Sequence, residues 1–132
     1  MKYQSQPIYH LVPTSYYNTQ PQDHPYQPDA FAQEGFIHCT AGTEMLVQVA
    51  NRYFNPLSEE LLVLEINPEA LTAPLKFEPP VPPAGQPVNG QKASPSNQDI
   101  LFPHIYGPLN REAIVHCFAM QRDETGKWQM PK

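Results

Sequence analysis

Prolines confine this chain to short secondary-structure segments. There are 17 prolines in 132 residues, well above the roughly 5% of average proteins. Most of the excess falls in residues 20–29 and 79–95. Proline lacks a backbone N–H and has a fixed φ, so it is excluded from helix interiors and from central strands. We therefore predict that these two stretches are loops and that the core comes from the apolar segments around them.

The apolar segments predict strands more often than helices. Strands are expected at 6–12, 36–40, 61–66, 75–78 and 100–106, with a final hairpin made of 113–120 and 127–130. Leu46, Val49, Ala50 and Tyr53 follow helical spacing, with Thr43 placed to cap that helix. A short helix is expected at 30–34, capped by Asp29 and stopped by Gly35, and a single turn at 67–71. Strands that run consecutively in the second half indicate an α+β fold rather than a wound α/β fold.

Length predicts a single domain covering residues 1–132. Within it, residues 79–99 show no sustained periodicity and are predicted to form a mobile loop, partly in the polyproline II conformation. A structureless loop of this length is often a functional lid. A passive insertion is the alternative.

Charge and composition exclude some classes of function. The net charge is −5, from 8 basic and 13 acidic side chains. Because nucleic-acid phosphates are bound through Lys and Arg, this balance argues against a nucleic-acid partner. No apolar stretch is long enough for a membrane span, and the first residues lack the apolar core of a signal peptide, so a cytoplasmic protein is expected. The oligomeric state is left open.

The two cysteines, Cys39 and Cys117, form no CxxC pair and are too few for a disulfide framework. Both lie in apolar runs, which predicts buried, reduced thiols. A nucleophilic role for Cys39 is the alternative, because Cys39 adjoins a histidine.

Three histidines lie in apolar, strand-like segments: His10, His38 and His104. A titratable ring is costly in such surroundings unless it is hydrogen-bonded or functional. We expect the three to converge on one cleft, as ligand-facing or catalytic groups. Satisfied core histidines are the alternative for each. A zinc site made by all three is a further alternative, although no HxH or HExxH spacing supports it. We predict no metal.

Other polar residues lie at positions that suit the same cleft. Thr40 is two residues beyond His38, and Tyr106 two beyond His104, so each pair can share a strand face. Gly107 would leave room for a close backbone approach. Glu78, the carboxylate nearest the 79–99 loop, is the candidate general base; a solvated strand-end carboxylate is the alternative.

The segments Gly35-Phe36-Ile37-His38-Cys39-Thr40 and Phe102 to Leu109 resemble the EGFIHCS-type and FPHIYGPL-type motifs of domain-of-unknown-function family 952, a small bacterial family. The resemblance covers most of the chain outside 79–99. The stretches that carry it are 8–11, 26–40, 50–54, 62–67 and 102–109.

That family is grouped with the ADP-ribosyltransferase-like fold, nearest the RNA 2′-phosphotransferases. The resemblance implies two small, mainly antiparallel sheets around a cleft, and a short helix at 14–18 in which Tyr16 or Tyr17 takes the place of a tryptophan. It also implies that His10 and the His38-Cys39-Thr40 strand approach NAD. The phosphotransferases hold phosphate with several arginines. No arginine lies beside a matching histidine here, which argues against transfer of an RNA phosphate.

Two functions remain as hypotheses. The first is an enzyme that binds NAD or an ADP-ribose-like nucleotide as substrate and transfers ADP-ribose with loss of nicotinamide. The residues assigned to it are His10, His38 and Glu78 as catalytic, and Thr40, His104 and Tyr106 as ligand-binding. The second is a small-ligand-binding module that keeps the cleft without catalysis.

Overall fold

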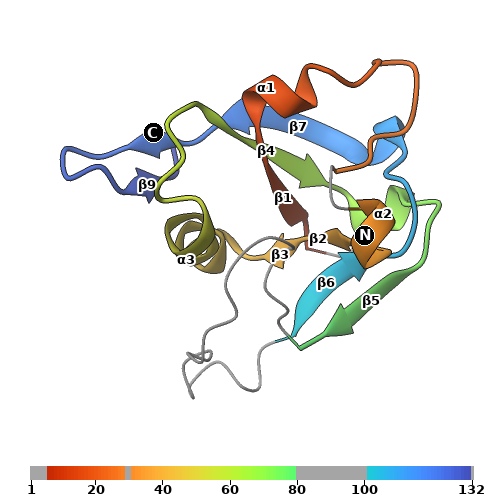
Figure 1. Cartoon of the computed structure of the whole chain (residues 1–132). Helices are drawn as coiled ribbons and strands as arrows, with labels where there is room; N and C mark the ends of the chain where they lie inside the picture. The colour runs from red at the N-terminus through yellow and green to blue at the C-terminus, as the bar shows by residue number, and fades with distance from the viewer. Residues whose placement is uncertain (1–5, 29–30, 80–100, 132) are drawn as a thin grey trace.

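Two antiparallel sheets packed through a shared core make up most of the molecule (Figure 1). The computed structural model describes residues 6–28, 31–79 and 101–131. In chain order, its elements are β1 (Ile8–Pro13), α1 (Thr14–Tyr17), α2 (Phe31–Glu34), β2 (Ile37–His38), β3 (Thr40–Ala41), α3 (Thr43–Tyr53), β4 (Leu61–Ile66), η1 (Pro68–Ala70), β5 (Leu75–Glu78), β6 (Phe102–Ile105), η3 (Arg111–Ala113), β7 (Ile114–Ala119), β8 (Gln121–Arg122) and β9 (Trp128–Gln129).

The larger sheet has the strand order β3-β1-β4-β7, and every pairing in it is antiparallel. The smaller sheet has the order β2-β6-β5, also antiparallel. A two-stranded ribbon, β8-β9, completes the described strands. The expected α+β class, with few helices and small, mainly antiparallel sheets, is confirmed.

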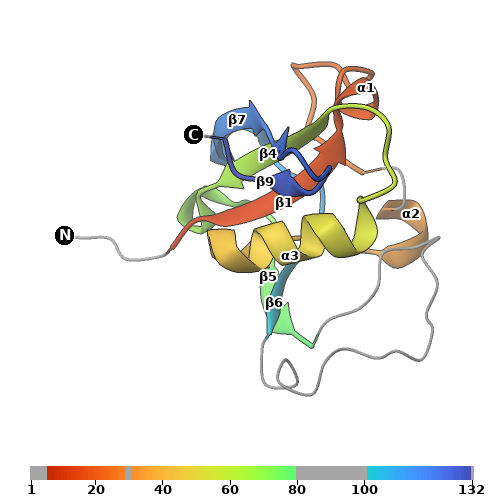
Figure 2. The same cartoon turned by 90° about the vertical axis from the view of Figure 1, so that its left-hand side faces the viewer.

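Both faces of β4, a central strand of the larger sheet, are covered, as its nearly unbroken apolar run predicts. Side chains alternate along a strand, and Leu61 and Val63 pack on one face with Leu46 and Ala50 of α3. Figure 2 shows α3 running along β1 on this side. Of the predicted stripe, Leu46 and Ala50 are buried and Val49 is partly buried against this cluster, whereas Tyr53 is not part of it.

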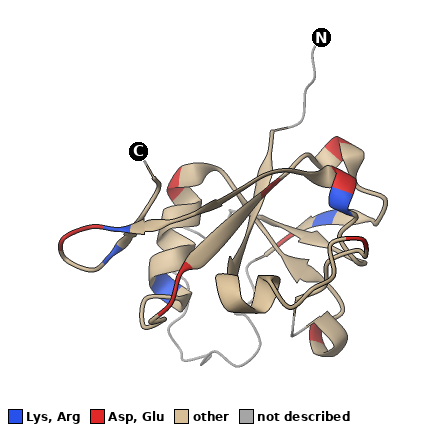
Figure 3. Ribbon diagram, turned by 90° about the horizontal axis from the view of Figure 1, so that it is seen from above, with Lys and Arg blue, Asp and Glu red and all other residues tan. Residues whose placement is uncertain are grey.

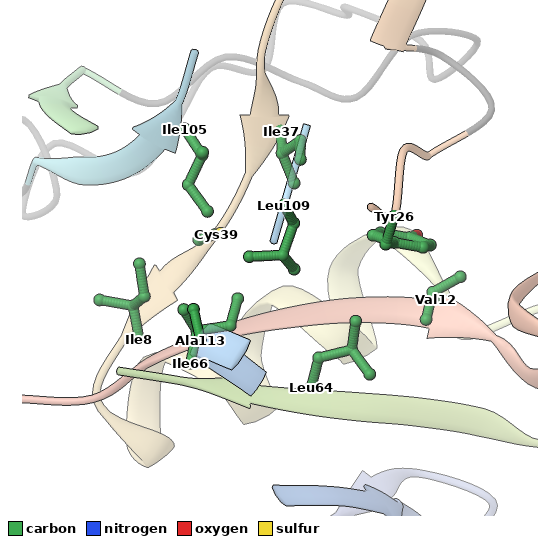
Figure 4. Packing of buried hydrophobic residues seen from close by; sticks show 10 residues of the cluster. All are labelled: Ile8, Val12, Tyr26, Ile37, Cys39, Leu64, Ile66, Ile105, Leu109 and Ala113. Carbon is green, nitrogen blue, oxygen red and sulfur yellow. The ribbon is translucent and has the colours of Figure 1, made fainter. Parts of the chain in front are cut away.

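The opposite face of the larger sheet meets the smaller sheet through a cluster of buried residues. Figure 4 shows Ile37, Cys39 and Ile105 from one side approaching Ile8 and the β4 residues from the other. The full cluster consists of Ile8, Val12, Tyr26, Ile37, Cys39, Leu64, Ile66, Ile105, Leu109 and Ala113. This packing fixes the smaller sheet against the larger one and so positions the candidate site.

The single strand expected at 36–40 is interrupted at Cys39. Before this residue, β2 pairs with β6; after it, β3 pairs with β1 in the other sheet. The Cys39 backbone N–H donates to the Pro103 carbonyl over 3.0 Å. The chain therefore passes from one sheet to the other within one residue.

Two local predictions were wrong. Thr43 does not cap α3: the N-cap is Gly42 (φ 90°), which contributes no side-chain hydrogen bond. Residues 113–120 do not form a hairpin with 127–130, because β7 pairs with β4 instead. The hairpin that does form joins β8 to β9.

Several other expectations match the structure. The single turn after β4 is η1, where the Asn67 side chain accepts from the Glu69 N–H over 3.0 Å. Gly35 (φ 81°) ends α2, and α1 occupies the position that the family resemblance implies. The 79–99 loop, except for Pro79, and the Asp29 cap lie outside the described residues.

Candidate functional site

The candidate site lies on the face of the smaller sheet that points away from the core. In the register of this sheet, His38 lies opposite His104, and His104 lies opposite Lys76. Their neighbours Ile37 and Ile105 pack into the core. Because side chains alternate along strands, the two histidines and Lys76 share the other face.

Four aromatic rings gather on this face. The ring centroid of Phe36 lies 4.8 Å from that of His38, 4.4 Å from that of His104 and 5.3 Å from that of Tyr106. The two imidazoles meet edge to face, with centroids 5.5 Å apart. We call these four residues the ring cluster. Phe36 lies at its centre and contacts the other three rings.

His104 and Tyr106 hold one carboxylate between them. The Glu78 Oε1 atom accepts from Nδ1 of His104 and from the Tyr106 hydroxyl, each over 2.7 Å. These two hydrogen bonds, that from His104 first, lower the pKa of Glu78. The same contact with Glu78 raises the pKa of Tyr106. The two donors therefore favour the ionised form of Glu78. The general-base role expected from its position stays a prediction.

A second carboxylate contacts the other imidazole. The His38 Nε2 atom lies 3.0 Å from Oε1 of Glu34, the last residue of α2. Burial lowers the pKa of His38, its hydrogen bond to Glu34 opposes this shift, and the nearby His104 adds to it. The site thus contains two carboxylate–imidazole pairs whose imidazoles are in contact.

His10 lies on the other side of β2, within the core. Its Nδ1 donates to the His38 backbone carbonyl over 2.7 Å, and its Nε2 lies 2.9 Å from the Tyr26 hydroxyl. Burial lowers the pKa of His10 to about 4, so the ring is neutral and Tyr26 donates to Nε2. Both nitrogens are engaged within the chain, which is the arrangement of a satisfied core histidine.

Thr40 is separated from the ring cluster by the break at Cys39 between β2 and β3. Thr40 is buried and pairs with Tyr9 in the larger sheet, and none of the hydrogen bonds between described residues joins it to His38. Burial raises the pKa of the Cys39 thiol, which opposes formation of a thiolate nucleophile. Cys39 is reduced and buried as predicted, whereas Cys117 is exposed.

A zinc site built from the three histidines does not form. His10 uses both of its ring nitrogens inside the core, and zinc ligands must offer a free nitrogen to the metal. Across residues 6–28, 31–79 and 101–131, no group of three or more His, Cys, Asp or Glu side chains could hold a metal ion.

Sequence reasoning missed two members of the site, Phe36 and Glu34. Both lie in the Glu34-Gly35-Phe36 stretch just before Ile37 and His38. This stretch belongs to the motif that carries the family resemblance, and the motif was the signal that could have identified them. A close backbone approach is expected at Gly107, and a Cβ placed there would lie 2.7 Å from the Cβ of Ala73. The close approach at Gly107 is therefore to the protein's own chain.

Lys76 places a positive charge beside the ring cluster. Its Nζ lies 4.9 Å from the centroid of the Tyr106 ring, within reach of a cation–π interaction. Arg111 and Arg122 instead donate to backbone carbonyls elsewhere. Figure 3 accordingly shows the Lys and Arg residues in separate places rather than in one basic patch.

In the described part of the chain, no helix combines the length and the apolar character that crossing a membrane requires.

Comparison with solved structures shows a shared fold. The structure is similar to that of protein CC0527 from Caulobacter crescentus, determined by X-ray crystallography, with a TM-score of 0.69, 22% sequence identity and 94% of each chain covered. A double mutant of CC0527 matches with the same TM-score and coverage at 21% identity. No match is found among curated proteins.

Comparison with protein families identifies a match over most of the length. Residues 11–117 match the family described as "Protein of unknown function (DUF952)". The matched region includes all four residues of the ring cluster and both of their carboxylate partners. This chain therefore belongs to the DUF952 family.

Proposed function

We propose that the ring cluster binds a small nucleotide of the NAD class. The observation that carries this proposal is the gathering of four rings and two carboxylates on one sheet face, with ring centroids 4.4 to 5.5 Å apart. Aromatic faces stack on planar bases, and imidazole and phenol groups form hydrogen bonds with ribose or amide oxygens. The resemblance of the histidine-bearing segments to ADP-ribosyltransferase-like proteins supports NAD as the ligand.

The chemistry proposed for this site is transfer of ADP-ribose. The bond between the ribose C1′ and the nicotinamide nitrogen breaks, and its electron pair leaves with nicotinamide. An acceptor hydroxyl then bonds to C1′ and releases a proton. Glu78 is held as an anion by His104 and Tyr106, so its proposed role is to stabilise the oxocarbenium-like ribose electrostatically. His38, which is nearer to solvent than His104, is the proposed proton acceptor.

A ligand-binding module without catalysis is the second candidate. The observation that favours it is the burial of His104, whose side chain is 2% exposed and lies against the Phe36 ring. A ligand that stacks on Phe36 would leave His104 covered. Binding would then proceed without direct participation of this imidazole in a reaction.

Titration with NAD tests the proposal. Calorimetry should detect binding to the wild type, and Phe36→Ala and His38→Ala should each weaken it by about fivefold or more, which corresponds to about 1–3 kcal/mol for a stacked aromatic contact. His116→Ala serves as the matched control because His116 is exposed and lies outside the ring cluster. A nicotinamide-release assay on the same samples separates the two candidates. Absence of NAD binding to the folded wild type would contradict both for this ligand.

A further inference from the structure

We infer that Glu34 is a positioning residue that makes Nδ1 of His38 the proton-accepting atom of the site. This inference rests on the proposed function, because it assigns a role within that reaction. It extends the site to α2, which carries none of the residues selected from the sequence. Four structural relationships support it.

The contact between Glu34 and His38 determines which nitrogen carries the proton. The His38 Nε2 atom lies 3.0 Å from Oε1 of Glu34. An ionised carboxylate can only accept hydrogen bonds, so Nε2 must donate. A neutral imidazole has one N–H and one lone pair. With the hydrogen on Nε2, the lone pair is on Nδ1, and Nδ1 is the atom that can take a proton.

The three histidines differ in accessibility, and the difference selects His38. The side chain of His38 is 23% exposed, whereas that of His104 is 2% exposed. His10 uses both ring nitrogens in the core. Of these three imidazoles, His38 is therefore the one that an acceptor hydroxyl can reach without rearrangement of the core or of Phe36.

Both partners of the pair are anchored by the backbone. Glu34 ends α2, and the following Gly35 adopts φ 81° while its N–H donates to the Phe31 carbonyl over 2.7 Å. This turn reverses the chain, so that the Glu34 side chain contacts that of His38, four residues later. His38 is fixed by its pairing with His104 in β6 and by the hydrogen bond from His10 to its carbonyl.

Among residues 6–28, 31–79 and 101–131, few charged or titratable groups lie around His38. Glu34 approaches from α2 and raises the pKa of His38, whereas His104 approaches from β6 and lowers it. Glu78 and Lys76, both of β5, contact other members of the ring cluster: Glu78 bonds to His104, and Lys76 lies over the Tyr106 ring. His10 contacts the backbone carbonyl of His38 and not the imidazole ring of His38. Removal of Glu34 therefore removes the described group that favours the protonated ring.

In the proposed step, the proton lost by the acceptor hydroxyl passes through His38 to solvent. When the acceptor hydroxyl bonds to C1′, its proton moves to Nδ1 of His38, which becomes imidazolium. Glu34 stabilises this cation through the Nε2–H hydrogen bond, as a carboxylate does for an imidazole base. The proton then leaves to solvent, since His38 is partly exposed.

Two measurements on Glu34→Gln test the inference. Nitrogen-15 NMR of the imidazoles should show His38 protonated at Nε2 in the wild type. In Glu34→Gln the population should move toward the Nδ1-protonated form and the pKa of His38 should fall. If the wild type releases nicotinamide from NAD, the variant should lower kcat by about tenfold or more with little change in KM, because general-base action contributes at least this much. The acid limb of its pH profile should move to lower pH.

Glu44→Gln is the matched control, because Glu44 lies in the exposed first turn of α3 and the substitution removes the same charge. It should change neither the His38 tautomer nor kcat. The inference is overturned if wild-type His38 is protonated at Nδ1, or if Glu34→Gln leaves the tautomer and pKa unchanged in a protein that remains folded. A wild type that binds no NAD would contradict the proposed function instead, while the NMR result still decides the role of Glu34.

Discussion

His10 supports the strand that carries His38. The Nδ1–H of His10 donates to the His38 carbonyl over 2.7 Å, from the core side of β2, while the His38 ring lies on the opposite side with the ring cluster. The two histidines are thus in contact but perform different tasks. His10 holds the backbone, and His38 presents its side chain to the site.

Replacing His10 with Phe should destabilise the fold by about 2–3 kcal/mol. The substitution leaves the His38 carbonyl and the Tyr26 hydroxyl without their partner, and an unsatisfied buried polar group costs about 1–3 kcal/mol. Urea unfolding at neutral pH measures the loss. His116→Phe, at an exposed position, should change the free energy of unfolding by less than about 0.5 kcal/mol. Equal stability of wild type and His10→Phe would show that these hydrogen bonds contribute nothing.

Stability should fall as the pH drops from about 6.5 to about 4. The pKa of His10 is lowered from 6.5 to about 4 in the folded protein, chiefly by burial. Between these values the unfolded chain binds the proton and the folded chain does not, so acid favours unfolding. The full effect is on the order of 3 kcal/mol. The lowered pKa of His38 acts in the same direction. Unfolding curves at several pH values measure the slope, which should be markedly smaller in His10→Gln.

Tyr106→Phe should raise the pKa of Glu78. The Tyr106 hydroxyl is one of two donors to Oε1 of Glu78, and each lowers the pKa of that carboxyl. Loss of one donor moves the pKa back toward its usual range, while the hydrogen bond from His104 remains. Carbon-13 NMR of the carboxyl groups measures this shift. In the same variant, the lowered pKa of Glu112, which lies outside the ring cluster, should not move.

Gly107→Ala should destabilise the fold by about 1–3 kcal/mol, the usual cost of overpacking. The added Cβ would lie 2.7 Å from the Cβ of Ala73. Thermal unfolding of the single variant, compared with the double variant Gly107→Ala/Ala73→Gly, isolates this contact. The double variant should recover part of the loss. If it recovers nothing, the clash is not the cause.

The sequence predicted the elements whose signals are local. The helical spacing of Leu46 and Ala50 and the apolar run of β4 correspond to α3 and to a strand buried on both faces. The predicted pairing of residues 113–120 with 127–130 was wrong because β7 pairs with β4, some fifty residues earlier in the chain. Local sequence patterns do not report the free energy of pairing between two strands so far apart in the chain. That free energy depends on how β7 packs in the larger sheet.

For the site, the sequence identified segments better than side-chain directions. His10, His38 and His104 do come close together, but β2 separates the first from the other two. Which face of a strand a residue occupies depends on register and on breaks in the strand. The break at Cys39 could not be inferred from an apolar run that continues through it. The roles assigned to His10, His38, Glu78, Thr40, His104 and Tyr106 remain predictions.

The crossing at Cys39 also limits how the molecule can move. Ile37 and His38 are hydrogen-bonded into one sheet and Thr40 and Ala41 into the other, with one residue between them. Neither sheet can slide or unfold alone without pulling on the edge strand of its neighbour. Backbone amides of β1 and β6 should therefore exchange with solvent deuterium through a common opening, so that the site is lost only when the whole domain opens.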